Sequence, residues 1–328
     1  MYMNSKHLIL TVAMFSTACG ASSCSTANKN DLPENNTVIT TVETIGSHAN
    51  EYTRAAKTVK VEPFTALTNK VYAKITLREG KEYKVEMKGD KTALANTRVY
   101  VEDKALVLEK KDKHTSKNDR EIEFVVYCPK ISGITNMGKL TLCSKITGFE
   151  ALEIDNSGLL NMDCSKLSRT KSLKISNRGK CEIMNFKTIS AEKMSFDNSG
   201  IINVSVNDMK CDEVDVKNHG QFTLSANNIN SSMFHIENVG LIECKAKASG
   251  KNVDITNKGK ADITVGFTGE KVEVNNSGVG NISLNVDCRH LDAKNSGNAD
   301  FKISGTAEDT SISGTGISKI NTKELNKF

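Results

Sequence analysis

Apolar and polar residues alternate with a period of two through the second half of the chain, and a repeated Asn-x-Gly triplet interrupts the alternation. From Asn156 onward, the positions four and two residues before each Asn are apolar, as Leu152 and Ile154 are before Asn156. The positions four and six residues after the Asn are apolar too, as Leu160 and Met162 are, except that Gly280 follows Asn276. A period of two is that of a β-strand with one buried face. The pattern therefore predicts strands on both sides of each triplet.

The triplet occurs nine times at a nearly constant spacing, and successive Asn residues lie 20, 21, 21, 20, 20, 19, 19 and 19 positions apart. The nine residues are Asn136, Asn156, Asn177, Asn198, Asn218, Asn238, Asn257, Asn276 and Asn295. Gly314-Thr315-Gly316 resembles a degenerate tenth copy. A strand-rich unit of about 20 residues predicts a parallel β-helix, whose coils stack about 4.8 Å apart. A meander of hairpins is the alternative, because Asn-x-Gly also occurs in hairpin turns.

The Asn and the Gly of each triplet have separate predicted roles. The Asn shares the parity of the apolar positions, so it is expected to point inward. The nine Asn side chains would then form a hydrogen-bonded ladder along the stack. The Gly is expected to let the backbone turn with a positive φ.

Residues 57–130 lack the triplet and form a β-rich segment that we expect to cap the first coil. An uncapped solenoid would expose apolar surface and strand edges. The predicted strands are one hairpin from 71–77 and 82–87, a second from 97–103 and 104–110, and a further strand at 121–127. The repeats are expected to fill residues 131–328.

The first 18 residues have the order of a secretory signal peptide. Lys6 and His7 precede a short apolar run, Leu8 to Phe15, which is too short to span a bilayer. The small residues before Cys19 resemble a bacterial lipobox, in which Cys19 would be cleaved and diacylated. An ordinary signal peptide that happens to contain Cys19 is one alternative, and Cys24, after Ala21-Ser22-Ser23, is a second candidate for the acylated cysteine. Residues 19–56 are rich in Ser, Thr and Asn and are predicted to form a flexible tether.

Four segments of the chain resemble the head GIN domain family. They are VEPFTALTNKVYAKITLREGKEYKVEMKGD (61–90), RVYVEDKALVLEKK (98–111), EFVVYCPKISGITNMGKLTL (123–142) and SISGTGISKI (311–320). The resemblance covers about residues 57–322. The resemblance implies a right-handed parallel β-helix. It also implies an outer-membrane lipoprotein of Bacteroidetes-type bacteria, in a family whose members are named as adhesins. The family provides no set of catalytic residues to transfer to this chain.

Composition narrows the classes of ligand. Lys and Arg number 44 and Asp and Glu number 39, so the net charge of +5 gives no support for nucleic-acid binding. Trp is absent, and every Tyr precedes the repeats. The rod therefore offers few aromatic surfaces on which sugars could stack, which argues against a sugar-processing enzyme and more weakly against a lectin.

Two outward columns are candidate binding surfaces. Three residues before the Asn, successive repeats carry Asp254, Glu273 and Asp292, which form either a solvated face or a site for a cation or basic ligand. Three residues after the Asn, polar and apolar residues alternate from coil to coil, which indicates either a contact face or a surface packed under a loop. This second column is Lys139, Leu159, Lys180, Ile201, Gln221, Leu241, Lys260, Val279 and Asn298.

The cysteines and histidines predict no metal site and no cofactor. The chain has no CxxC motif, and its histidines do not converge. Cys143 and Cys164 lie on adjacent predicted coils, where they could form a disulfide in an oxidising compartment or fill the core as small apolar residues.

These features lead us to expect a non-catalytic cell-envelope lipoprotein with an adhesin-like or scaffold role. Its expected partners are the outer membrane, through the lipid anchor, and an unidentified protein or glycan. Exposed solenoid edges would also allow copies of the chain to associate end to end. The first alternative is a periplasm-facing envelope protein that binds a protein partner. A polysaccharide-active enzyme ranks lowest, because no clustered catalytic site is visible.

Overall fold

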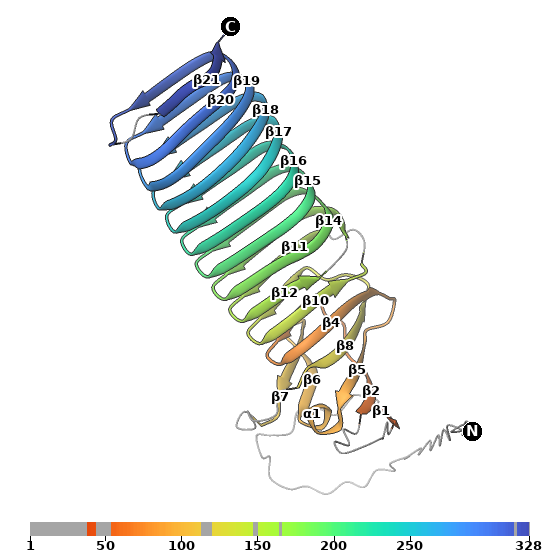
Figure 1. Ribbon diagram of the computed structural model, residues 1–328. Coiled ribbons are helices and arrows are strands. Elements are labelled where there is room, and N and C mark those ends of the chain that lie inside the picture. The colour runs from red at the N-terminus through yellow and green to blue at the C-terminus, as the bar shows by residue number, and fades with distance from the viewer. Residues whose placement is uncertain are drawn as a thin grey trace, which may run out of the picture.

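The chain forms an elongated stack of coils with a smaller β-rich end (Figure 1). The computed structural model describes residues 38–43, 54–112, 120–146, 150–163, 166–317 and 320–327. These residues form 21 strands and one short helix, α1 (Lys91–Ala95). The predicted all-β parallel solenoid is confirmed.

Each later coil is almost one continuous strand, and six of the eight begin directly after the Gly of one triplet and end at the Asn of the next. These coils are β13 (Lys166–Asn177), β14 (Lys180–Asn198), β15 (Ile201–Asn218), β16 (Gln221–Asn238), β17 (Leu241–Asn257), β18 (Lys260–Asn276), β19 (Val279–Asn295) and β20 (Asn298–Gly314). The earlier coils are divided into β9 (Gly133–Asn136), β10 (Lys139–Ser144), β11 (Ala151–Asn156) and β12 (Leu159–Asp163). The last strand is β21 (Ile320–Lys327).

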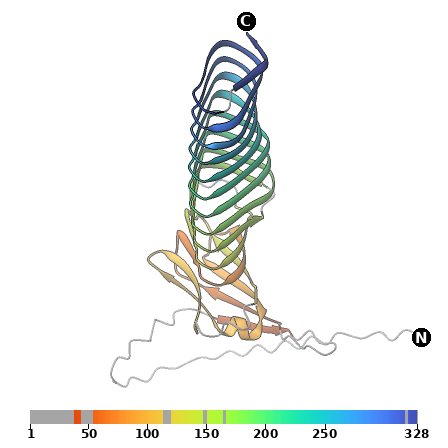
Figure 2. The same cartoon turned by 60° about the vertical axis from the view of Figure 1, so that its left-hand side comes forward.

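Neighbouring coils pair in parallel, with Asn opposite Asn, as in the pairing of β15 with β16. A hairpin meander would require antiparallel pairs, so that alternative is wrong. Figure 2 shows the coils stacked one upon another along the rod. Apolar residues fill the interior and form one continuous core, in which the rings of Phe196 and Phe222 meet edge to face with centroids 5.3 Å apart.

A column of small residues lies seven positions before the end of each later coil. Its members are Thr170, Ala191, Cys211, Ser231, Gly250, Gly269, Cys288 and Ala307. Because this distance is constant, the shortening of the coils from 21 to 19 residues takes place between the Asn turn and this column. The register shifts at Ile183/Phe186 and Ala226/Ile229 lie in that stretch.

The stack of coils begins before the predicted boundary at residue 131. The strands of the N-terminal part are β1 (Val38–Glu43), β2 (Arg54–Lys60), β3 (Ala66–Asn69), β4 (Tyr72–Glu79), β5 (Lys84–Asp90), β6 (Thr97–Glu102), β7 (Ala105–Lys110) and β8 (Ile122–Cys128). β3 pairs in parallel with β9, and β4 pairs in parallel with β10. The first coil is therefore built from residues that we assigned to the cap.

The cap ends the stack by changing from parallel to antiparallel pairing. β8 pairs in parallel with β4 but antiparallel with β5, and β5 pairs antiparallel with β2. The predicted hairpin of 71–77 with 82–87 is therefore wrong, because β8 lies between its two strands. The second predicted hairpin is present as β6 and β7. β1 pairs antiparallel with β2, so residues 38–43 extend the sheet although they lie in the predicted tether.

We expect Phe222→Ala to lower the free energy of unfolding by about 3–5 kcal/mol, because it removes a fully buried ring from the middle of the stack. Gln221→Ala, at the exposed neighbouring position, should change it by less than about 0.5 kcal/mol. Urea unfolding followed by circular dichroism measures both. Similar losses for the two variants would contradict this account of the core.

Candidate functional site

The structure brings the nine predicted Asn residues together in one buried column inside the rod. Each of the first eight donates from Nδ2 to Oδ1 of the Asn in the next coil, at 2.7 or 2.8 Å. Asn69 adds a rung at the start, with Nδ2 2.9 Å from Asn136 Oδ1. The triplet pattern missed Asn69 because Val71 replaces the Gly. The apolar spacing around it, with Leu67 before and Ala73 after, would have identified it.

The ladder also satisfies the backbone at the turn. Asn156 Nδ2 lies 3.2 Å from the Gly158 carbonyl oxygen and 3.0 Å from that of Lys180. The Asn136 carbonyl oxygen accepts hydrogen bonds from the N–H groups of both Ser157 and Gly158. The same pair of hydrogen bonds to one carbonyl oxygen recurs along the stack. Buried amides need such partners because an unsatisfied one costs about 1–3 kcal/mol. The column is therefore a structural element and does not present groups to a ligand.

The expected role of the triplet glycines was wrong. Among the described residues, the only glycines with a left-handed φ are Gly250, Gly280 and Gly305, and none of these belongs to an Asn-x-Gly triplet. A Cβ on Gly220 would instead lie 2.1 Å from the Gly200 carbonyl oxygen, and the other triplets from Gly158 onward have similar geometry. Glycine is required because successive turns approach too closely for any side chain.

The acidic column is assembled in register, with Asp254 opposite Glu273 and Glu273 opposite Asp292. Two of its three charges are balanced by lysines of the rod. Lys271 Nζ lies 2.9 Å from Glu273 Oε2, and Lys294 Nζ lies 3.0 Å from Asp292 Oδ2. Asp254 has the imidazole of His235 3.3 Å away. No cluster of three or more His, Cys, Asp or Glu residues with metal-binding geometry occurs in the described ranges.

Glu273 shows the effect of this balance on its protonation. The hydrogen bond from Lys271 is the largest cause that lowers the pKa of the Glu273 carboxyl, followed by the hydrogen bond from Asn275. The same contact raises the pKa of Lys271. Both groups are therefore held in their charged forms, so a basic ligand would have to displace a lysine.

The alternating column three residues after each Asn lies on the outside of the rod in continuous register. Leu159, Ile201, Leu241 and Val279 are all exposed, so the alternative that the column packs under a loop is wrong. The middle residues of the triplets lie beside this column. We call the two columns together the turn ridge; its second column is Met137, Ser157, Arg178, Ser199, His219, Val239, Lys258, Ser277 and Ser296.

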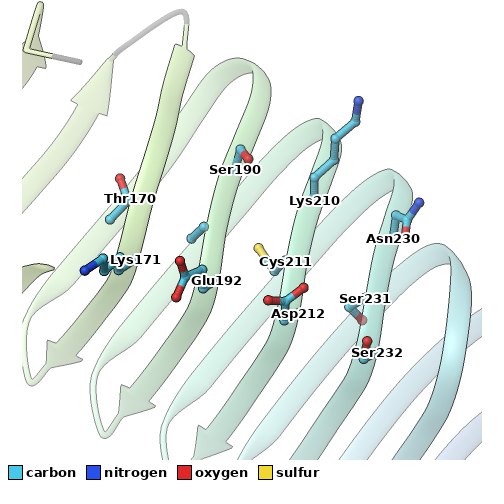
Figure 3. Close-up of a pocket in the computed structure, with 11 residues that line it drawn as sticks. Thr170, Lys171, Ser190, Glu192, Lys210, Cys211, Asp212, Asn230, Ser231 and Ser232 are labelled. Atoms are coloured by element: carbon cyan, nitrogen blue, oxygen red, sulfur yellow. The ribbon is translucent and has the colours of Figure 1, made fainter. Parts of the chain in front are cut away.

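A polar groove of about 550 Å³ crosses the small-residue column on strands β13 to β16. Figure 3 shows its residues on four neighbouring strands. Thr170, Cys211 and Ser231 are buried, while Lys171, Glu192, Lys210 and Asp212 contribute two charges of each sign. The alternation of apolar and polar residues gave no indication of this groove. The small residue that recurs seven positions before the end of each later coil was a usable signal.

The cysteines of the rod behave as core residues. Burial raises the pKa of the Cys181 and Cys244 thiols to about 12 and that of the Cys128 thiol to about 11. Such thiols are poor nucleophiles at neutral pH. Cys164 lies outside the described residues, as do Cys19 and the predicted signal peptide.

Parallel coils, an inward Asn ladder and an antiparallel cap define the protein as a capped β-solenoid. The chain belongs to the family described as "Putative auto-transporter adhesin, head GIN domain", whose model matches residues 63–248 and 251–327. This confirms the resemblance drawn from the sequence. No curated protein matches the chain.

The crystal structures of two proteins, each described as a putative adhesin, are similar to the chain. The one from Bacteroides fragilis is 16% identical and has a TM-score of 0.41, with 84% of this chain and 97% of that chain covered. The one from Parabacteroides distasonis is 13% identical and has a TM-score of 0.42, with the same coverage. Within the described part of the chain, no helix has the length and apolar character needed to cross a membrane.

We expect Asn218→Ala to lower the free energy of unfolding by roughly 2–4 kcal/mol, because it removes the ladder acceptor of Asn198 Nδ2 and the ladder donor of Asn238 Oδ1 in the core. Asn227→Ala is the matched control, since Asn227 donates to Asn207 on the exposed surface. Its loss should stay below about 1 kcal/mol. Equal losses in urea unfolding would contradict a structural role for the buried ladder.

Lys271→Ala should raise the pKa of Glu273, because it removes the largest cause that lowers it. In the wild type, the contribution of Glu273 to stability is present above its unfolded pKa and is lost as the pH falls through its folded pKa. In the variant that contribution should shrink. NMR titration of the Glu273 carboxyl measures the shift, with Lys294→Ala as a control that should move it less. An unchanged titration in Lys271→Ala would show that the ion pair is not formed in solution.

Proposed function

We propose that the chain is a non-catalytic cell-envelope lipoprotein, anchored to the outer membrane through Cys19, whose solenoid has an adhesin-like or scaffold role. The observation that carries the proposal is a rigid rod of the adhesin-head family that follows a predicted export signal and lipobox. A rod of this kind holds the outward side chains of successive coils at a fixed spacing. Those of the later coils lie far from the cap (Figure 1). Such an arrangement suits the presentation of a binding surface.

The charged surface supports a binding role better than an enzymatic one. A glycoside hydrolase needs a pair of carboxyl groups with separate tasks, usually an acid and a base or nucleophile. Here Glu273 and Asp292 of the acidic column are each paired with a lysine of their own coil. The triplet Asn residues are committed to the interior, so they provide no reactive groups at the surface.

Protease treatment of intact cells, followed by immunoblotting for the solenoid, tests the location. Loss of the signal from unbroken cells is expected if the rod faces the outside. Protection until the outer membrane is opened would favour the periplasm-facing alternative, in which the chain binds an envelope protein.

Cys19→Ala should abolish incorporation of a labelled fatty acid and release the chain from the membrane fraction. Cys24→Ala is the matched control, because it removes the neighbouring cysteine and leaves the predicted lipobox intact. Acylation that persists in Cys19→Ala would overturn the proposed anchor.

A further inference from the structure

Exposed apolar side chains are concentrated along the turn ridge. In the described part of the chain, nine large apolar side chains are exposed, and six of them lie on this ridge. They are exposed by 38–56%. The six are Met137, Leu159, Ile201, Val239, Leu241 and Val279. This distribution marks the ridge as a contact surface, since scattered exposed apolar residues would need no explanation.

The ridge is also basic. Its two columns contain five Lys or Arg residues and no Asp or Glu. The basic residues are Lys139, Arg178, Lys180, Lys258 and Lys260. Arg178 is paired with Asp155 and Lys180 with Glu182, both outside the ridge. Lys258 and Lys260 form no ion pair with any residue that the structure describes. The column on one side of the ridge carries acids and no base, namely Glu182, Glu243, Asp262 and Asp300, and the column on the other side mixes acids with Lys217 and Lys294.

We propose that the turn ridge lies along the surface of a lipid bilayer with anionic headgroups. Lysines between the apolar residues would contact phosphate groups, and the apolar side chains would enter the boundary between headgroups and acyl chains. Both interactions are those of proteins that lie in a membrane interface. Long lysine side chains can extend alongside buried apolar groups and keep their charge in the headgroup layer.

The spacing of the apolar residues favours a lipid surface over a protein partner. In the alternating column the apolar residues are two coils apart, which is about 9.6 Å. They therefore do not form the continuous apolar centre of a protein interface, from which lysine is usually depleted. A second copy of the chain is a poor partner, because each basic strip would face another. A fluid headgroup layer can adapt to any spacing along a straight ridge.

The inference goes beyond the proposed function and does not depend on acylation of Cys19. If Cys19 is acylated, the ridge would provide a second membrane signal, and two signals give firmer attachment than one. The ridge spans nine coils, or about 38 Å, so the rod would lie along the membrane. A rod that projects from the cell would have the ridge free.

Vesicle flotation of the full chain carrying Cys19→Ser tests the proposal without the anchor. The expected result is binding to vesicles of phosphatidylcholine mixed with phosphatidylglycerol, weaker binding to phosphatidylcholine alone, and release as the salt concentration rises. Absence of binding to the anionic vesicles would overturn the proposal. Binding to soluble polyglutamate but not to vesicles would also overturn it and would indicate an acidic protein partner.

Two ridge variants locate the contact. The first variant removes apolar groups and combines Leu159→Ser, Leu241→Ser and Val279→Ser. The second variant removes positive charge and combines Lys258→Gln and Lys260→Gln. Each should weaken binding to anionic vesicles about tenfold or more. The controls are Met184→Ser with Met233→Ser, and Lys210→Gln with Lys251→Gln, which alter exposed residues outside the ridge. They should bind within about twofold of the parent chain.

Unchanged urea midpoints would show that the ridge variants remain folded. If the folded ridge variants bind as tightly as their controls, the ridge is not the membrane contact. Failure of this experiment leaves the proposed adhesin-like role intact, because that role is tested by location on the cell and by acylation.

Discussion

The hydrogen bond from each Asn amide to the Asn of the next coil is the constraint on which the rest of the structure depends. A carboxamide carries a donor and an acceptor on one short side chain, so it can bond to a copy of itself on each side. Asp lacks the donor, and Ser is shorter. With all amides aligned, each bond polarises its neighbours. The stack is thereby fixed at the position where one strand ends and the next begins in the later coils.

The turn explains the glycine, and the fixed turn explains where the coils vary. Because both N–H groups after the Asn bond to the carbonyl below, successive turns lie in contact, and a Cβ at the Gly position would overlap the chain beneath. Coils of 19 to 21 residues can still share one Asn column, since the extra residues are taken up on the far side by register shifts. The groove across β13 to β16 lies in the region of these longer coils.

The sequence predicted the solenoid well because its main signal is repeated and local. Alternation placed the strands, and the triplet placed the inward turn. The first coil was missed because Asn69-Lys70-Val71 lacks the Gly, and strand pairing in the cap was missed because β8 inserts between strands that are adjacent in sequence. The exposed apolar column could be found from parity alone. The lysine partners of Glu273 and Asp292 lie two residues away on the same strand, so the alternation could have indicated them. The freedom of the column from covering loops depends on three-dimensional neighbours that no local pattern encodes.

The outer columns face a problem that the inner ones do not. Any side chain that recurs at one position is repeated about every 4.8 Å, and like charges at about 4 Å repel by about 1 kcal/mol even in water. In the acidic column the rod offsets this repulsion with lysines of the same coil. Elsewhere on the surface, opposite charges on neighbouring coils form ion pairs, as in the 2.7 Å pair of Lys193 with Glu213. Along each column of the turn ridge the charges are instead separated by uncharged residues, and Arg178 and Lys180 are paired with acids outside the ridge. Lys258 and Lys260 form no ion pair with any described residue, so their positive charge is available to a partner.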